Sequence, residues 1–170
     1  MWWMLACTGG GESAADTDTA DNNCAGTPTV EIGDGNDPFT PILDGSDHIM
    51  THGPQGGWHM LASVRTTNTD DIVTIHYTIQ VLPELILVSD NKYRVQLKDV
   101  GNCQGTYWNM YGYLDVSKLA TGDLKTPPEL MCGRSARLTM EVYDAANVGD
   151  TATVEVTAIN DPADTCGPQP

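Results

Sequence analysis

One thirteen-residue segment of this chain holds the side chains best suited to chemistry. It contains three of the four histidines, His48, His52 and His59, and the methionines Met50 and Met60. Imidazole nitrogen and thioether sulfur together suit copper, especially the reduced ion. This composition makes His48, Met50, His52 and His59 candidate ligands of a copper ion.

The geometry of a strand argues against a single site built from this segment. A tight turn at Gly53-Pro54-Gln55-Gly56 would fold His52 back toward His59. In an extended strand, however, His59 points away from the face that carries Trp58 and Met60. The alternative is structural: the turn leads into a core strand, and the histidines are half-exposed.

Short acidic loops are a second kind of candidate metal site. Calcium takes six to eight oxygen ligands, and Asp and Asn side chains supply them. No loop here reproduces the twelve-residue EF-hand, and Asx residues in turns also hydrogen-bond their own backbone, which is the alternative explanation. The loops are Asp34 to Asp37, Asp44 to Asp47, Asp70-Asp71 and Asn160 to Asp164.

Aromatic residues crowd a second part of the chain. Strand alternation predicts that Tyr107, Tyr111 and Tyr113 share the face opposite Trp108. With Trp58, the three tyrosines form a candidate binding surface, because exposed aromatic rings stack on sugars or contact a protein partner. The alternative is that they cover a sheet face beneath a loop.

Composition limits the class of protein. The chain has 170 residues, 40% of them hydrophobic, which is about one globular domain. Its 23 acidic and 8 basic residues give a formal net charge of −15, so nucleic acid would be repelled and a soluble monomer is expected. Ser63 follows no nucleophile-elbow pattern, and we predict that the protein is not an enzyme.

The elements that must position these residues are strands. Apolar and polar residues alternate with period two from residue 29 onward, and turn clusters separate the runs. A single helical turn is expected over Ser117–Gly122. About seven strands suit two antiparallel sheets packed face to face, with a lipocalin-like barrel as the alternative. The predicted strands lie near residues 30–32, 58–65, 73–81, 93–98, 108–116, 136–142 and 152–158.

The last two runs carry a resemblance. Residues 137–144, a turn, residues 151–157 and the exit Ile159-Asn160-Asp161-Pro162 resemble the closing hairpin of bacterial Ig-like and cadherin-like repeats. The resemblance implies an antiparallel Ig-like β-sandwich. It also adds a reason to consider calcium, since cadherin-like modules use Asn-Asp exits to hold it.

Five cysteines are present, none of them in a CxxC pair. With Cys7 set apart, four remain and allow three disulfide connectivities. We favour Cys24–Cys166, which would tie the two ends of the domain together, and Cys103–Cys132. The alternative is that some thiols are free and buried.

The start of the chain bears on location. Leu5-Ala6-Cys7, after apolar residues, resembles the end of a bacterial lipoprotein signal peptide, which implies that Cys7 is lipidated. The basic region of a working signal is missing, so we expect the true start to lie upstream. The residue after Cys7 is Thr8 and not an acidic residue, and in this the chain resembles lipoproteins sorted to the outer membrane. A chance Ala-Cys pair is the alternative.

The predicted organisation follows from these points. Residues 1–7 are the signal remnant and lipidated cysteine, 8–28 a disordered acidic tether, 29–166 the sandwich and 167–170 a tail. No run of 18 apolar residues predicts a membrane-spanning helix. The predicted function is a non-catalytic cell-envelope lipoprotein for adhesion, structure or binding of an envelope protein or glycan. The alternative is a periplasmic copper- or calcium-binding module that uses the histidine segment or the acidic loops.

Overall fold

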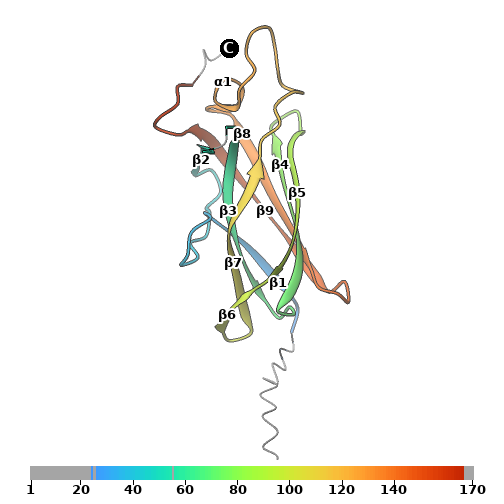
Figure 1. The fold of residues 1–170 in the computed structure, drawn as a ribbon. Coiled ribbons are helices and arrows are strands. Elements are labelled where there is room, and N and C mark those ends of the chain that lie inside the picture. The colour runs from blue at the N-terminus through green and yellow to red at the C-terminus, as the bar shows by residue number, and fades with distance from the viewer. Residues whose placement is uncertain (1–23, 25, 55, 167–170) are drawn as a thin grey trace, which may run out of the picture.

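The computed structural model describes residues 24, 26–54 and 56–166, and within them the chain is almost entirely β (Figure 1). One short helix interrupts the strands. The elements are β1 Thr29–Gly33, β2 Asp47–His52, β3 Trp58–Thr67, β4 Ile72–Val81, β5 Ile86–Gln96, β6 Lys98–Gly101, β7 Gln104–Tyr113, α1 Pro127–Met131, β8 Ser135–Tyr143 and β9 Gly149–Asn160.

The strands form two layers. One contains β1, β3, β7 and β6, and the other contains β5, β4, β8 and β9. Strand β2 joins the layers, since its first half pairs in parallel with β9 and its second half pairs antiparallel with β3. The other strand pairs in the described chain are antiparallel. This strand order is that of an immunoglobulin-type sandwich, so the all-β prediction is confirmed.

The ends of the strand order, β5 and β6, are not paired with each other in the described residues, so the sheet does not close into a barrel. The described residues form nine strands instead of about seven. The two that the sequence did not predict are β2, whose composition suggested a metal site, and the four-residue β6.

The core lies between the two layers and follows the predicted alternation. Burying each large apolar side chain contributes roughly 1.5–3 kcal/mol. Every second residue of β4 faces inward and is buried, and the paired strand β8 shows the same pattern. The buried residues of these two strands are Val73, Ile75, Tyr77, Ile79, Val81, Ala136, Leu138, Met140 and Val142.

Gly112 of β7 makes room for the ring of Tyr77 in this core. A Cβ atom at Gly112 would lie 2.8 Å from Cε1 of Tyr77 and 2.5 Å from Cδ1 of Ile79. The Tyr77 hydroxyl is buried, and among the described residues it has no hydrogen-bond partner. Burial raises the pKa of Tyr77, so the phenol stays neutral.

A β-bulge in β7 changes which side chains share a face. The pairing of β3 with β7 shifts between Ala62 and Val64, and Asn109 takes a left-handed φ of 58°. The Asn109 N–H donates to the Gly35 carbonyl at 3.0 Å, in the loop that follows β1. Because of the shift, Tyr107 pairs with the buried Val64 and packs against the core.

The prediction that Tyr107 shares a face with Tyr111 and Tyr113 is therefore wrong, because Tyr107 points inward. Tyr111 and Tyr113 lie beyond the bulge and pair with Leu61 and His59 on the outer face. The bulge is not visible in the alternation of residue types, since a single Asn between aromatic residues does not show where the register shifts.

Two disulfides are formed, Cys24–Cys103 and Cys132–Cys166, so the favoured pairing of Cys24 with Cys166 and of Cys103 with Cys132 is wrong. The reason is the direction of β7. Cys103 precedes this ten-residue strand, and the connection that leads to Cys132 starts at its other end. Ten residues of strand span about 33 Å, far beyond the reach of a disulfide.

The predicted helical turn over Ser117–Gly122 is a hydrogen-bonded turn, in which Leu119 and Ala120 both donate to the Val116 carbonyl. The helix α1 starts instead at Pro127. No helix in the described part of the chain is long and apolar enough to cross a membrane. Cys7, the predicted tether up to residue 23 and the tail 167–170 lie outside the described residues.

Candidate functional site

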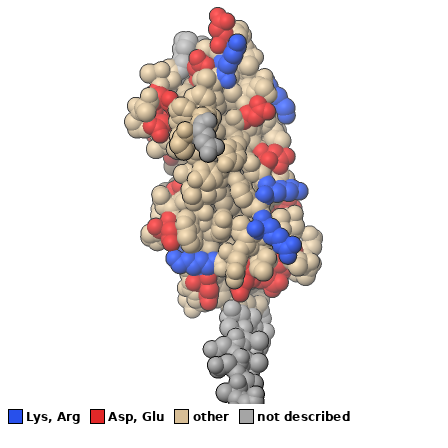
Figure 2. All heavy atoms as spheres, viewed as in Figure 1, with Lys and Arg blue, Asp and Glu red and all other residues tan. Residues whose placement is uncertain are grey.

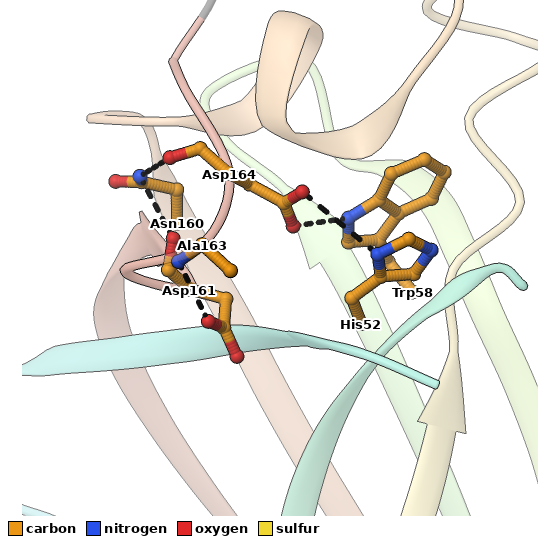
Figure 3. Close-up of polar contacts among 6 residues, drawn as sticks. All are labelled: His52, Trp58, Asn160, Asp161, Ala163 and Asp164. Atoms are coloured by element: carbon orange, nitrogen blue, oxygen red, sulfur yellow. Dashed lines mark hydrogen bonds and ion pairs between the residues drawn. The ribbon is translucent and has the colours of Figure 1, made fainter. Parts of the chain in front are cut away.

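The end of the sandwich at the top of Figure 1 gathers several of the predicted site residues. Here β2 ends at His52 and β3 begins at Trp58, and the two residues are paired across the strands. Their rings stack, with centroids 4.7 Å apart and planes 8° from parallel (Figure 3). The indole N–H of Trp58 donates to Oδ2 of Asp164 at 2.8 Å.

Asp164 is held in place by the segment that follows β9. The Asn160 side-chain amide donates to the carbonyls of Asp161 and Asp164, and Oδ1 of Asp161 accepts the Ala163 N–H (Figure 3). The Cys132–Cys166 disulfide ties the end of this segment to the residue after α1. Oδ1 of Asp164 lies 3.8 Å from Nδ1 of His52.

A small cavity of about 350 Å³ lies beside this contact. Trp58 and Asp164 line it together with Thr126, Pro128, Glu129, Thr165 and Cys166. We call it the Trp58 pocket. Its far wall is the first turn of α1, where Oε2 of Glu129 accepts the backbone N–H groups of Lys125 and Thr126. These hydrogen bonds lower the pKa of Glu129, so the carboxylate stays charged.

A second aromatic group lies on the outer face of the same strand ends. His59 is only 6% exposed and contacts the rings of Tyr111 and Tyr113 edge-on, at centroid distances of 4.7 and 6.2 Å. The two tyrosine rings stack at 5.7 Å, and Tyr113 is 61% exposed. Burial lowers the pKa of His59. The predicted binding residues Trp58, Tyr111 and Tyr113 thus come together at one end, although on two faces.

The predicted copper ligands are not brought to one point. His48 is buried, and its Nε2–H donates to the Leu61 carbonyl at 2.8 Å. Met50 is fully buried and pairs with Met60 in the core. His52 stacks on Trp58, while His59 faces the other side of the sheet. Nowhere in residues 24, 26–54 and 56–166 do three His, Cys, Asp or Glu side chains lie where they could hold a metal ion together.

The acidic loops use their carboxylates within the protein. Asp34 accepts hydrogen bonds from the backbone and side chain of Asn36. Asp44 accepts the backbone N–H of Glu155, which extends the edge of β9. Asp161 accepts from Ala163 in an Asx turn. These contacts give Asp34, Asp44 and Asp161 structural roles.

The opposite end of the sandwich has a broad open groove of about 1480 Å³ beside the Cys24–Cys103 disulfide. Asp70, Asp71, Asp99 and Asp144 line it, with Arg94 as the one basic side chain among its described lining residues. On the face shown in Figure 2, acidic and basic side chains are interspersed.

Sequence reasoning did not place either carboxylate of the Trp58 pocket, Glu129 or Asp164, beside Trp58. A signal for Glu129 existed, because Thr126-Pro127-Pro128-Glu129 has the spacing of a capping box with proline at the first helical position. Asp164 was considered only as an oxygen ligand for calcium, and no local pattern links it to Trp58, 106 residues earlier.

In comparisons with known proteins, no family model and no curated protein sequence matches this chain. Among solved structures, the CooA pilin subunit from enterotoxigenic Escherichia coli is similar with a TM-score of 0.38 and 11% sequence identity. That similarity covers 79% of this chain and 99% of the pilin chain.

Proposed function

We propose that this protein is a non-catalytic module of the bacterial cell envelope that binds a partner through the upper end of its sandwich. The observation that carries the proposal is the set of aromatic side chains at the ends of β2, β3 and β7. Tyr113 is 61% exposed and stacks on Tyr111, and Trp58 lines a pocket nearby. Aromatic side chains of this kind dominate the energetics of binding surfaces.

Binding fits this end better than catalysis because its imidazoles have structural partners. His48 donates to a backbone carbonyl, His52 stacks on Trp58, and His59 is buried against Tyr111 and Tyr113. A general acid or base must reach a substrate proton directly or through one water. The buried rings of His48 and His59 are poorly placed for that task.

The cysteines support an extracytoplasmic location. Disulfides persist in oxidising compartments, and two of them hold opposite ends of this sandwich. We place the protein on the outer membrane through a lipid on Cys7, with the partner an envelope protein or glycan. Mass spectrometry of the mature protein from its native host tests the anchor. An unmodified Met1 at its N-terminus would contradict it.

Site-specific photo-crosslinking in the native host tests the binding surface. A benzophenone amino acid is introduced at position 113, and a matched variant carries it at position 143, a tyrosine at the lower end. We expect a discrete crosslinked product from position 113 and none from position 143. Products from position 143 alone would show that the partner binds the lower end and would contradict the proposal. Glycosidase digestion of the product then separates a glycan from a protein partner.

Metal binding is the alternative function, and the short distance between His52 and Asp164 is the observation on its side. Metal analysis of protein purified without added metals tests it. Stoichiometric copper that is lost in a His52→Ala, His59→Ala double variant would favour this alternative over partner binding.

A further inference from the structure

We propose that the Trp58 pocket binds the ammonium group of a lysine side chain on a partner protein. This inference rests on the proposed binding function and names the chemistry of the partner. It draws on three features of the pocket: an aromatic wall, two carboxyl groups, and a volume large enough for one side chain.

The aromatic wall comes from Trp58, whose indole is the best natural partner for a cation over its face. Hydrogen bonding to Asp164 and stacking with His52 fix the indole from two directions. Pro128, which is buried, forms an apolar wall opposite the strands. An apolar wall suits the four-carbon stem of lysine, which packs along apolar surface while its charged end meets a polar group.

The charge comes from Asp164 and Glu129, which line the same cavity. All the hydrogen bonds that Glu129 makes in the described chain use Oε2, which leaves Oε1 available. Asp164 accepts the Trp58 N–H on Oδ2, and its Oδ1 lies 3.8 Å from His52. No lysine or arginine belongs to the described lining of the pocket, so its charge favours a cation.

The size of the pocket admits a single side chain and excludes a large ligand. Its volume of about 350 Å³ is near the lower limit for ligand pockets. An amino sugar also carries an ammonium group, but the buried Pro128 suits the apolar stem of lysine better than the hydroxyl groups of a sugar ring. Lysine is therefore the favoured source of the cation.

Titration of the full-length protein tests this proposal, with the NMR signal of the Trp58 indole N–H as the readout. The probe is Nα-acetyl-lysine amide, and Nα-acetyl-norleucine amide supplies the same stem without the charge. We expect a saturable shift with the lysine probe, weakened at high salt, and little shift with norleucine. Equal shifts with norleucine or with glucosamine would overturn the proposal.

Two isosteric variants locate the interaction. Asp164→Asn keeps an oxygen for the Trp58 N–H, and Glu129→Gln keeps an oxygen for the helix cap. Each should weaken binding of the lysine probe by up to about fivefold, the upper end of the range for an exposed ion pair. Asp123→Asn removes one charge from the same connection but lies outside the pocket lining, so it should leave affinity unchanged.

Equal effects of all three variants would mean that only net charge is sensed and would overturn the pocket. If Asp164→Asn disorders the segment, seen as a lost indole signal, the Glu129→Gln variant alone decides. Crosslinking at position 113 without any response to the lysine probe would keep the proposed function and reject this inference. A lysine response without crosslinking from position 113 would keep the lysine pocket and reject the face that carries Tyr113 as the binding surface.

Discussion

The two ends of the sandwich each have a disulfide, but their connections between strands differ in length. Each has one disulfide, Cys24–Cys103 at the lower end and Cys132–Cys166 at the upper end. At the lower end short turns join β3 to β4, β6 to β7 and β8 to β9, and an open acidic groove lies between them. At the upper end the long connection from β7 to β8 folds over the strand ends and includes α1.

This difference shows where a binding site can form on a rigid sandwich. Short turns leave side chains spread around a wide opening, whereas the long upper connection supplies a second wall facing Trp58. Binding residues are common on loops that a rigid scaffold positions. We therefore expect changes at the lower end to act mainly on stability, and changes at the upper end to act on both stability and binding.

The largest expected effect is removal of a disulfide. Cys24 and Cys103 are 79 residues apart, and Cys132 and Cys166 are 34 apart. In the chain-entropy model, replacing each pair by alanine costs about 4.5 and about 3.8 kcal/mol respectively. Urea unfolding measures both. A larger loss from the upper pair would show that this bridge also holds native contacts such as that of Asp164 with Trp58.

How far the sequence predicted this fold is clearest from individual strands. Alternation in β3, β4, β8 and β9 predicted strands with the correct inner faces, because one side of each strand is buried. The short strand β2 was not predicted because its residue types do not alternate as a strand's should: His48 is buried, whereas the apolar Ile49 is exposed. The predicted side for Tyr107 was wrong, because a bulge at Asn109 changes the register of β7 against β3.

The candidate site was predictable only in part. Trp58 and Tyr113 were identified from their residue types, but their surroundings depend on contacts between distant segments. Asp164 meets Trp58 because β9 ends beside the start of β3. Likewise, Cys132 pairs with Cys166 because the connections that carry them lie at the same end of the sandwich. Neither relation is encoded in local spacing, and both require the strand order.

Two glycines of β7 compare the packing near the two ends. A Cβ at Gly112, toward the upper end, would meet Tyr77, Ile79 and the Met60 carbonyl, all of them buried. A Cβ at Gly105, toward the lower end, would meet Leu97 at the edge of the groove. We expect Gly112→Ala to cost about 2–3 kcal/mol and Gly105→Ala about 1 kcal/mol, both measured by thermal unfolding. An inverted order would mean that the groove edge is the more rigid of the two.

The upper half of the sandwich should also make stability depend on pH. Burial lowers the folded-state pKa of His48 from 6.5, and burial also lowers that of His59. As the pH falls below 6.5 the unfolded chain takes up protons first, so stability is complete above 6.5 and is lost below it. Each histidine contributes a slope of at most about 1.4 kcal/mol per pH unit.

Replacing His48 by glutamine separates the two histidines. Glutamine can still donate to the Leu61 carbonyl but does not titrate. The His48→Gln variant should lose part of the slope of unfolding free energy between pH 7 and pH 5, leaving the part due to His59. An unchanged slope would show that His48 does not titrate differently in the folded and unfolded states.

The smallest expected effect lies between the two ends, where neither loops nor disulfides act. The Tyr77 hydroxyl is buried, and no described residue gives it a hydrogen-bond partner, so Tyr77→Phe removes a desolvated polar group. We expect a stability change within about 1 kcal/mol of zero, on the stabilising side. Tyr93→Phe is the matched control, because the Tyr93 hydroxyl donates to the Tyr111 carbonyl and its loss should cost about 1 kcal/mol. A clear destabilisation by Tyr77→Phe would instead require a buried water on this hydroxyl, since a water can satisfy a polar group in an otherwise apolar core.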